Sequence, residues 1–163
     1  MDTLKPEIEN LCDIRIDKEG VWYYRGAEMY RTDIVEYLFR YLDQEKSGHY
    51  YIELSRSDRC RIEVEDTAFV VRSVEKKMTG NNAMDSILIQ LSDGSREELC
   101  LESLSVSAEN VLYCRVKANR FVARFSRKSH YQLLDDLEYD EKLEQYFLKL
   151  NGHRFYISEN MRN

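Results

Sequence analysis

The sequence predicts an α+β protein of two strand-rich domains that share a duplicated hairpin-helix-strand unit. Two segments, residues 31–38 and 127–134, repeat one pattern: an arginine, a helix N-cap, a capping partner three positions later, and an apolar helix face. A glycine-histidine-aromatic strand start follows each of them, at residues 48–52 and 152–157. Short runs of alternating polarity between turn residues fill most of the remaining chain, so strands should outnumber the two principal helices.

The first half reads as a helix, a hairpin, a second helix and a strand. Residues 1–11 predict a short polar helix entered through Pro6, and residues 14–24 predict a hairpin that turns at Gly20. A capped helix is expected over residues 33–43, with Asp33 as the N-cap and Glu36 as its partner. A strand should follow over residues 50–54.

The second half begins, on this interpretation, at the polar turn of residues 55–58, which divides the chain into domains 1–57 and 58–163. Alternation then predicts strands over residues 60–65, 69–74, 87–91, 99–101, 111–117 and 120–126. The second helix should have Ser129 as its N-cap and Gln132 as the capping partner, and a last hairpin should cross Asn151 and Gly152.

Composition limits the classes of function. The 163 residues carry a net charge of −6, and the pI is near 5.2, which argues against binding to DNA or RNA as polymers. No apolar run approaches the length that a bilayer requires, and the first residues resemble no secretory leader, so we expect a cytoplasmic protein without a membrane partner.

The four cysteines, Cys12, Cys60, Cys100 and Cys114, are widely spaced and form no C-x-x-C pair. The sequence therefore favours reduced, half-buried thiols. Only Cys114 has an adjacent basic residue, Arg115, of the kind that activates a thiol.

Catalytic motifs are missing from the sequence. The six glycines lie in turns and form no phosphate-binding loop, the three histidines are isolated from cysteine partners, and no G-x-S-x-G segment occurs. We therefore expect no metal, no cofactor and no enzymatic activity.

The strongest local anomaly is a basic segment over residues 115–128. It contains six basic residues and no acid: Arg115, Lys117, Arg120, Arg124, Arg127 and Lys128. Alternation along the strand should direct Arg120, Val122 and Arg124 to one face, where guanidinium groups suit phosphate or carboxylate. The alternative is intramolecular, because six acids within residues 135–144 could neutralise the segment by surface ion pairs.

Arg31 and Arg127 stand out because each immediately precedes a predicted capped helix. Either arginine could tie its hairpin to its helix, reach an acid such as Glu65 or Asp66, or bind an anion that also faces the helix N-terminus. The structural tie is favoured. Trp22, within an aromatic cluster, could belong to the core or stack on a planar ligand.

Several of these segments together resemble the bacterial family known as domain of unknown function 1285 (DUF1285). The resemblance lies in residues 20–26, 29–31, 38–39 and 62–70 of the first half and residues 123–134 of the second. Ala68 and the Ser55-Arg56 pair depart from the prolines typical of the family. The resemblance implies two domains with a duplicated core, the second like a pleckstrin-homology barrel, a small-ligand site, possibly for a nucleotide, at the domain interface, and a role in signalling.

The leading functional hypothesis is a non-catalytic cytoplasmic protein that binds a small anionic, nucleotide-like ligand at that interface. The residues predicted to line the site are Trp22, Arg31, Glu65, Asp66, Arg120 and Arg127. One alternative is a protein-interaction module that docks an acidic protein through the basic segment. A weaker alternative is a hydrolase with Glu65 or Asp66 as the base.

Overall fold

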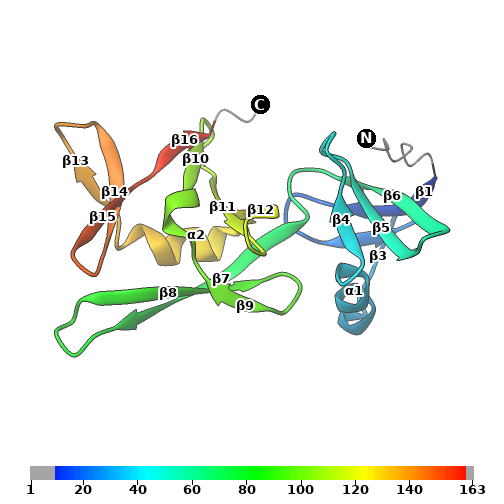
Figure 1. Cartoon of the computed structure of the whole chain (residues 1–163), viewed down its shortest axis with the longest axis horizontal. Coiled ribbons are helices and arrows are strands. Elements are labelled where there is room, and N and C mark those ends of the chain that lie inside the picture. Colours follow the sequence, from blue (N-terminus) through cyan, green and yellow to red (C-terminus); the bar gives the residue numbers. More distant parts are fainter. Residues whose placement is uncertain (1–9, 161–163) are drawn as a thin grey trace, which may run out of the picture. The chain divides into compact units, whose positions relative to one another are not determined.

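The computed structural model describes residues 10–160 of the chain (Figure 1). The chain divides into two compact units, Met1–Ala68 (unit 1) and Phe69–Asn163 (unit 2). The sequence placed a domain boundary between residues 57 and 58. In the structure these two residues lie in the tight turn between two strands that pair with each other, with Tyr51 opposite Arg61. A polar turn marks a hairpin as readily as a domain boundary, and the pairing of the flanking strands distinguishes the two.

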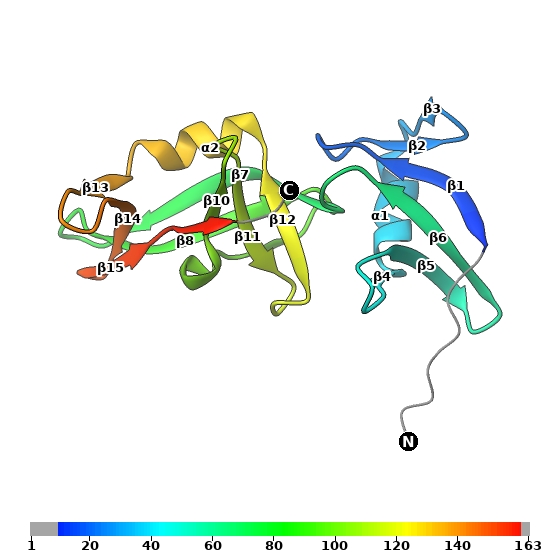
Figure 2. The ribbon, with the colours of Figure 1, turned by 90° about the horizontal axis from the view of Figure 1, so that it is seen from above.

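Unit 1 consists of one six-stranded sheet and one helix, α1 (Thr32–Phe39), which lies within the curl of the sheet (Figure 2). The strand order is β3-β2-β1-β6-β5-β4, and only the pairing of β1 with β6 is parallel. The strands are β1 (Leu11–Ile16), β2 (Trp22–Tyr24), β3 (Ala27–Glu28), β4 (Leu42–Gln44), β5 (Tyr50–Ser55) and β6 (Asp58–Val64).

The core of unit 1 lies between α1 and the sheet face that carries the apolar residues of its strands. Its buried side chains include Ile16, Trp22, Phe39, Ile52 and Ile62. Residues of alternate polarity on β1 and β6 leave charged side chains on the opposite face, as a half-buried sheet requires.

Unit 2 contains a seven-stranded sheet of order β16-β10-β11-β12-β7-β8-β9 and a three-stranded sheet of order β13-β14-β15. The first sheet consists of β7 (Phe69–Met78), β8 (Met84–Leu91), β9 (Arg96–Glu98), β10 (Ser105–Ser107), β11 (Leu112–Val116), β12 (Phe121–Phe125) and β16 (Ser158–Asn160). The second consists of β13 (Glu138–Asp140), β14 (Gln145–Leu150) and β15 (His153–Tyr156). A short 3₁₀ turn, η1 (Leu101–Ser103), and the helix α2 (Arg127–Leu134) complete the unit.

Helix α2 lies along the part of β7 that β12 does not reach, and its side chains bond to the backbone of β7 there. Strand β12 pairs with only the first residues of the long strand β7, up to Val71. Beyond that point, Val71 O accepts bonds from Ser126 N (3.0 Å) and from the Ser129 hydroxyl (2.8 Å), and Val74 N donates to Gln132 Oε1 (2.8 Å). The helix thereby covers a strand edge that would otherwise expose unpaired backbone groups.

The predicted strand-rich α+β class with two helices is confirmed for the described residues, and so is the repeated order of elements. In each unit a hairpin precedes an eight-residue helix, and a glycine turn then leads into a strand of a second hairpin. Unit 2 has the additional strand β13 between its helix and that hairpin. The likeness of unit 2 to a pleckstrin-homology barrel stays a prediction.

The helix termini differ from the prediction. Helix α1 begins after Arg31 with no side-chain cap, and it ends at Phe39 because residues from Leu42 pair with β5 as strand β4. In α2 the N-cap is Ser126, whose hydroxyl accepts Ser129 N at 3.2 Å, so Ser129 stands in the first turn. Gln132 bonds to β7, which explains why it is no capping partner. The helix predicted over residues 1–11 lies mostly outside the described residues, and Leu11 already belongs to β1.

Candidate functional site

Four of the six predicted site residues lie in unit 1, and two lie in unit 2. Trp22 is a core residue, because only 2% of its surface is exposed and its ring packs edge-on against Phe39 with centroids 4.8 Å apart. Its indole N–H is buried without a hydrogen-bond acceptor among the described residues. A side chain held in this way stabilises unit 1 and offers no stacking face to a ligand.

Arg31 lies on the surface of unit 1 and forms an ion pair with Asp33. The Nη2 atom of Arg31 is 2.6 Å from Oδ2 of Asp33, and its Nε is 3.2 Å from Oδ1. The hydrogen bond from Arg31 lowers the pKa of Asp33 below its usual value, and the same bond raises the pKa of Arg31. Since both side chains are largely exposed, this pair adds little stability, but it occupies one edge of the guanidinium group.

Glu65 closes a turn of unit 1. Its carboxylate accepts the backbone N–H of Lys18 at 2.9 Å, and its own N–H donates to Ile16 O at 2.9 Å. Asp66, the next residue, is half-buried. The carboxylate of Glu65 is therefore engaged within unit 1.

The basic segment of residues 115–128 forms the hairpin β11–β12 and the start of α2. At its tip, residues Lys117, Ala118 and Asn119 all have positive φ angles, between 54° and 66°. Lys117 is held by Asp93 (2.6 Å) and by the Ser95 hydroxyl (2.7 Å).

The two arginines of this tip are exposed. Arg115 donates to Asn119 O at 3.3 Å, and the Arg120 guanidinium lies 5.1 Å from the centroid of the Phe121 ring. The predicted alternation of β12 is confirmed, since Phe121, Ala123 and Phe125 are buried, while Val122 and Arg124 are half-buried on the other face.

A second group of basic side chains surrounds the start of α2. Strand register places Arg124 opposite Val70, and Arg72 stands two residues further along β7, where the register with β8 shifts between Val71 and Ser73. The Ser126 hydroxyl donates to Arg72 O at 3.4 Å, which brings the first turn of α2 beside Arg72. Arg127 and Lys128 in that turn are exposed. We call Arg72, Arg124, Arg127 and Lys128 the α2 basic site.

Sequence reasoning found Arg127 but missed Arg72. The signal available was weak, because outward alternation within residues 69–74 marks Arg72 as exposed but does not say which strand lies beside it. Only the parallel pairing of β7 with β12, between residues far apart in the sequence, brings Arg72 to the start of α2.

The acids that could neutralise the basic segment include two that have other partners. Asp136 forms an ion pair with Lys76. Asp140 accepts from the Tyr156 hydroxyl at 2.8 Å and from Arg154 at 3.3 Å. The Tyr156 hydrogen bond, with backbone bonds from Leu143 and Lys142, lowers the pKa of Asp140. The Asp136 carboxylate therefore pairs with a lysine of β7, and the Asp140 carboxylate pairs with side chains of the three-stranded sheet of unit 2.

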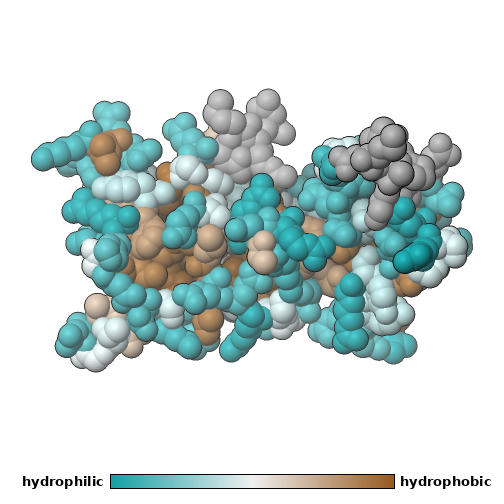
Figure 3. Space-filling model, viewed as in Figure 1, coloured by the Kyte–Doolittle hydropathy of each residue, from teal (hydrophilic) through white to brown (hydrophobic). Residues whose placement is uncertain are grey.

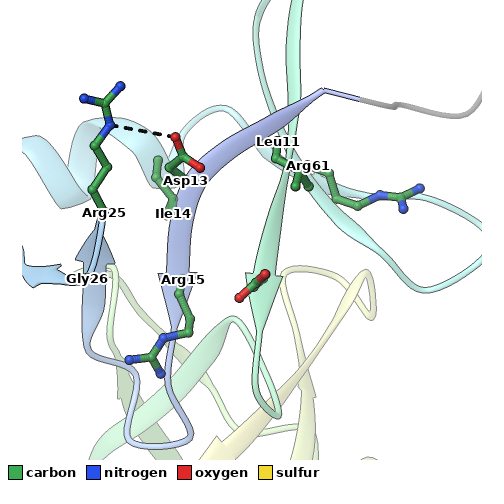
Figure 4. A pocket seen from close by; sticks show the side chains of 8 residues that line it. Leu11, Asp13, Ile14, Arg15, Arg25, Gly26 and Arg61 are labelled. Carbon is green, nitrogen blue, oxygen red and sulfur yellow. Dashed lines mark ion pairs between the residues drawn. The ribbon is translucent and has the colours of Figure 1, made fainter.

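Unit 1 carries a separate pocket of about 230 Å³ on the polar face of its sheet. Its charged lining residues are Asp13, Arg15, Arg25, Arg61 and Glu63. Figure 4 shows Arg15, Arg25 and Arg61 pointing in different directions, with Arg25 linked to Asp13 by an ion pair of 3.8 Å. The three guanidinium groups therefore do not converge on one point, and the pocket is a mixed-charge hollow.

A further hollow in unit 1 and a hydrophobic surface region in unit 2 have other linings. One, of about 240 Å³, lies beside the start of α1 and is mainly apolar, with Tyr24, Met29, Tyr30 and Ile34 around Arg31. In unit 2, Figure 3 shows hydrophobic residues gathered around the position of α2 within a largely hydrophilic surface. Tyr131 and Leu134 of α2 are among the exposed large side chains.

The cysteines differ from the prediction of four reduced thiols. Cys12 and Cys60 form a disulfide between β1 and β6, with Cα atoms 5.2 Å apart. The prediction was wrong because these cysteines are 48 positions apart, and only the pairing of β1 with β6 makes them neighbours. Cys114 is buried, and burial raises its pKa far above the usual value, so the adjacent Arg115 does not activate it.

Two absences hold for the described residues. No group of three histidine, cysteine, aspartate or glutamate side chains between residues 10 and 160 is arranged to hold a metal ion. Neither helix in this part of the chain is long and apolar enough to cross a membrane.

Comparison with known proteins found one family model that matches the N-terminal part of the chain. The family model described as domain of unknown function (DUF1285), N-terminal domain, matches residues 1–67. The resemblance found in the sequence is thus confirmed by a match of residues 1–67 to the N-terminal domain of that family. No curated protein matches the chain.

Two solved structures share the fold. A DUF1285 family protein from Silicibacter pomeroyi DSS-3 has a TM-score of 0.75 at 22% identity, over 94% of this chain and 84% of that one. A DUF1285 family protein from Shewanella baltica OS155 has a TM-score of 0.60 at 14% identity, over 75% of this chain and 90% of that one.

Proposed function

We propose that the protein is a non-catalytic binding protein for a small phosphate-bearing molecule, and that the α2 basic site binds the anionic group. The observation that carries this proposal is the gathering of Arg72, Arg124, Arg127 and Lys128 from β7, β12 and α2 around one helix start. We further propose that binding serves signalling rather than chemistry.

The chemistry of these groups supports a phosphate. Guanidinium groups donate forked hydrogen bonds that match phosphate oxygens, and a helix N-terminus adds the partial positive charge of its first-turn N–H groups. The side chain of Ser126 accepts Ser129 N, whereas the N–H groups of Arg127 and Lys128 precede the first intrahelical bond, donated by His130 N to Ser126 O. No acid occurs between residues 115 and 128 of the sequence.

The proposal retains Arg127 from the sequence-based site and adds three basic residues. Trp22 is excluded as a ligand contact by its burial in the core of unit 1. Arg31, Glu65, Asp66 and Arg120 stay predicted ligand contacts, and alanine variants of these four test them individually.

The test is isothermal titration calorimetry of the full chain with inorganic phosphate and with nucleoside mono-, di- and triphosphates. We expect saturable binding of at least one phosphate compound, and we expect the double variant Arg127→Ala, Lys128→Ala to weaken it at least tenfold. Affinity should also fall with added salt, because exposed charges make the contacts.

The matched control is Arg96→Ala, which removes one exposed guanidinium from β9 in the same unit. It should leave affinity unchanged. The absence of saturable heat with every probe would remove the proposal, and so would equal loss of affinity in the control variant.

A further inference from the structure

The Cys12–Cys60 disulfide joins two neighbouring strands of unit 1 in the middle of its sheet. Cys12 lies on β1 and Cys60 on β6, and both residues are half-buried. A half-buried disulfide can be reached by a small thiol without global unfolding. The position of the bond in the sheet determines what its cleavage would do.

The pairing of β1 with β6 is the seam between the two halves of the sheet, since the order β3-β2-β1 meets β6-β5-β4 there. The register of this pairing shifts between Leu11 and Arg15, as that of β5 with β6 does between Glu53 and Ser55, and Asp13 within the first shift has a φ of 56°. A non-glycine residue in this region is strained, and a bulge leaves local backbone groups unpaired.

Backbone hydrogen bonds flank the disulfide on both sides. Arg61 N donates to Asn10 O at 2.6 Å at one end of the seam, and Glu65 N donates to Ile16 O at 2.9 Å at the other. Cys12 lies within the interrupted part of β1, and Cys60 immediately precedes Arg61, the register partner of Leu11. The disulfide therefore adds a covalent link at the end of the seam where the interruption of the ladder begins.

The mixed-charge pocket lies over the same seam. Arg15 and Glu63, which line it, are register partners on β1 and β6, and Asp13 and Arg61 come from the same two strands (Figure 4). A change in the separation of β1 and β6 would move these side chains relative to one another. The state of the disulfide is thus coupled by geometry to the shape of this pocket.

We propose that the Cys12–Cys60 disulfide is a redox-responsive clasp that a dithiol reductant opens, releasing the β1–β6 seam and reshaping the pocket above it. A thiolate of the reductant attacks one sulfur of the disulfide, and the other cysteine leaves as a thiolate and takes up a proton. The second thiol of the reductant then resolves the mixed disulfide. Two electrons and two protons pass to the protein, and the reductant becomes a cyclic disulfide.

Hydrogen exchange on the native full chain tests the clasp. We expect reduction with dithiothreitol to speed exchange at least tenfold at the amides of Arg61 and Glu65. The amides of Glu53 and Glu45, which donate to Tyr41 O and His49 O in the β4–β5 hairpin away from the seam, should change much less. Loss of global stability alone would speed exchange alike at every amide of unit 1, so the decisive comparison is between the seam and the control amides. Equal exchange at the seam before and after reduction would overturn the proposal, and so would a rise at the seam no greater than the rise at Glu53 and Glu45.

Thiol titration under native conditions separates a responsive clasp from an inert bridge. Equilibration with mixtures of reduced and oxidised glutathione, followed by alkylation and mass spectrometry, should show reversible conversion of Cys12 and Cys60 without denaturant. A disulfide that stays oxidised until urea unfolds the chain would overturn the proposal.

Two variants complete the experiment. The double variant Cys12→Ser, Cys60→Ser should show the fast seam exchange with or without reductant, whereas Cys100→Ser, which alters a free half-buried thiol of unit 2, should respond like the unchanged chain. If the double variant fails to fold, reduction and reoxidation of the native chain still decide the matter. The test involves only unit 1, so its outcome is independent of anion binding at the α2 basic site.

Discussion

Removal of the Cys12–Cys60 disulfide should destabilise unit 1 by an amount that follows from the length of chain it closes. The two cysteines are 48 positions apart, and the chain-entropy relation for a loop of this size gives about 4 kcal/mol at room temperature. A unit of 68 residues has a total stability of roughly 3–10 kcal/mol, so this loss is a large fraction of it. The double variant Cys12→Ser, Cys60→Ser should therefore unfold at a much lower urea concentration.

The assay can be made specific to unit 1, because Trp22 is the single tryptophan of the chain and lies in the core of that unit. Urea denaturation followed by tryptophan fluorescence reports its unfolding, while circular dichroism reports both units. The variant Cys100→Ser serves as the control. A loss of less than about 1 kcal/mol, with an unchanged slope of free energy against urea, would refute the loop-closure reasoning.

Three further changes concern unit 2. Ser129→Ala removes a fully buried hydroxyl that donates to Val71 O, so we expect a loss of about 1–2 kcal/mol in urea denaturation, with Ser129→Thr as the milder comparison. Leu148→Ala empties a position with no exposed surface, and it should cost about 2–5 kcal/mol in the same assay. Burial raises the pKa of Asp93, but hydrogen bonds from Lys117 and from the serine two residues further on outweigh it, and the net pKa is lowered. Because the folded-state pKa of this carboxyl is lowered, it stabilises the folded state at pH values above its unfolded-state pKa of about 3.9, and this stability is lost as the pH falls through the folded-state pKa. Lys117→Met should therefore reduce the dependence of unfolding free energy on pH in this acidic range.

The order of elements could be predicted from the sequence because its signals are local. Alternating polarity, glycine turns and the arginine at the start of each helix are all read within a few residues, and they found both helices and most of the strands. The helix termini were missed where a residue had a more distant bonding partner. Gln132 bonds to β7 rather than to its own helix, and Leu42 pairs with Ile52 rather than extending α1.

The arrangement of the candidate sites depends on strand pairing between residues far apart in the sequence. The disulfide requires β1 beside β6, and the contribution of Arg72 to the α2 basic site requires β7 beside β12. Both pairings are parallel, and a parallel pairing has no hairpin turn to announce it. Sequence reasoning therefore named Cys12 without its partner Cys60, and it missed Arg72.

The two copies of the repeated unit differ at one position that bears on anion binding. In the first copy, Asp33 stands two residues after Arg31 and engages two nitrogens of its guanidinium group. In the second copy, the residue two positions after Arg127 is Ser129, whose hydroxyl is buried against Val71 O and Ser126 O. Within the described part of the chain, no acid forms an ion pair with Arg127.

The same repeated segment thus leads to opposite electrostatic outcomes. The first copy neutralises its arginine locally, whereas the second leaves a positive charge at the exposed start of a helix whose dipole adds to it. Because Asp33 is exposed and Ser129 is fully buried, the difference cannot be reversed by a simple exchange: Asp33→Ser would release Arg31 at little cost, but Ser129→Asp would bury a carboxylate beside carbonyl oxygens. A phosphate titration that detects new, weak binding in Asp33→Ser and none in Asp33→Glu would show that the acid two residues after the arginine controls anion binding in this repeat.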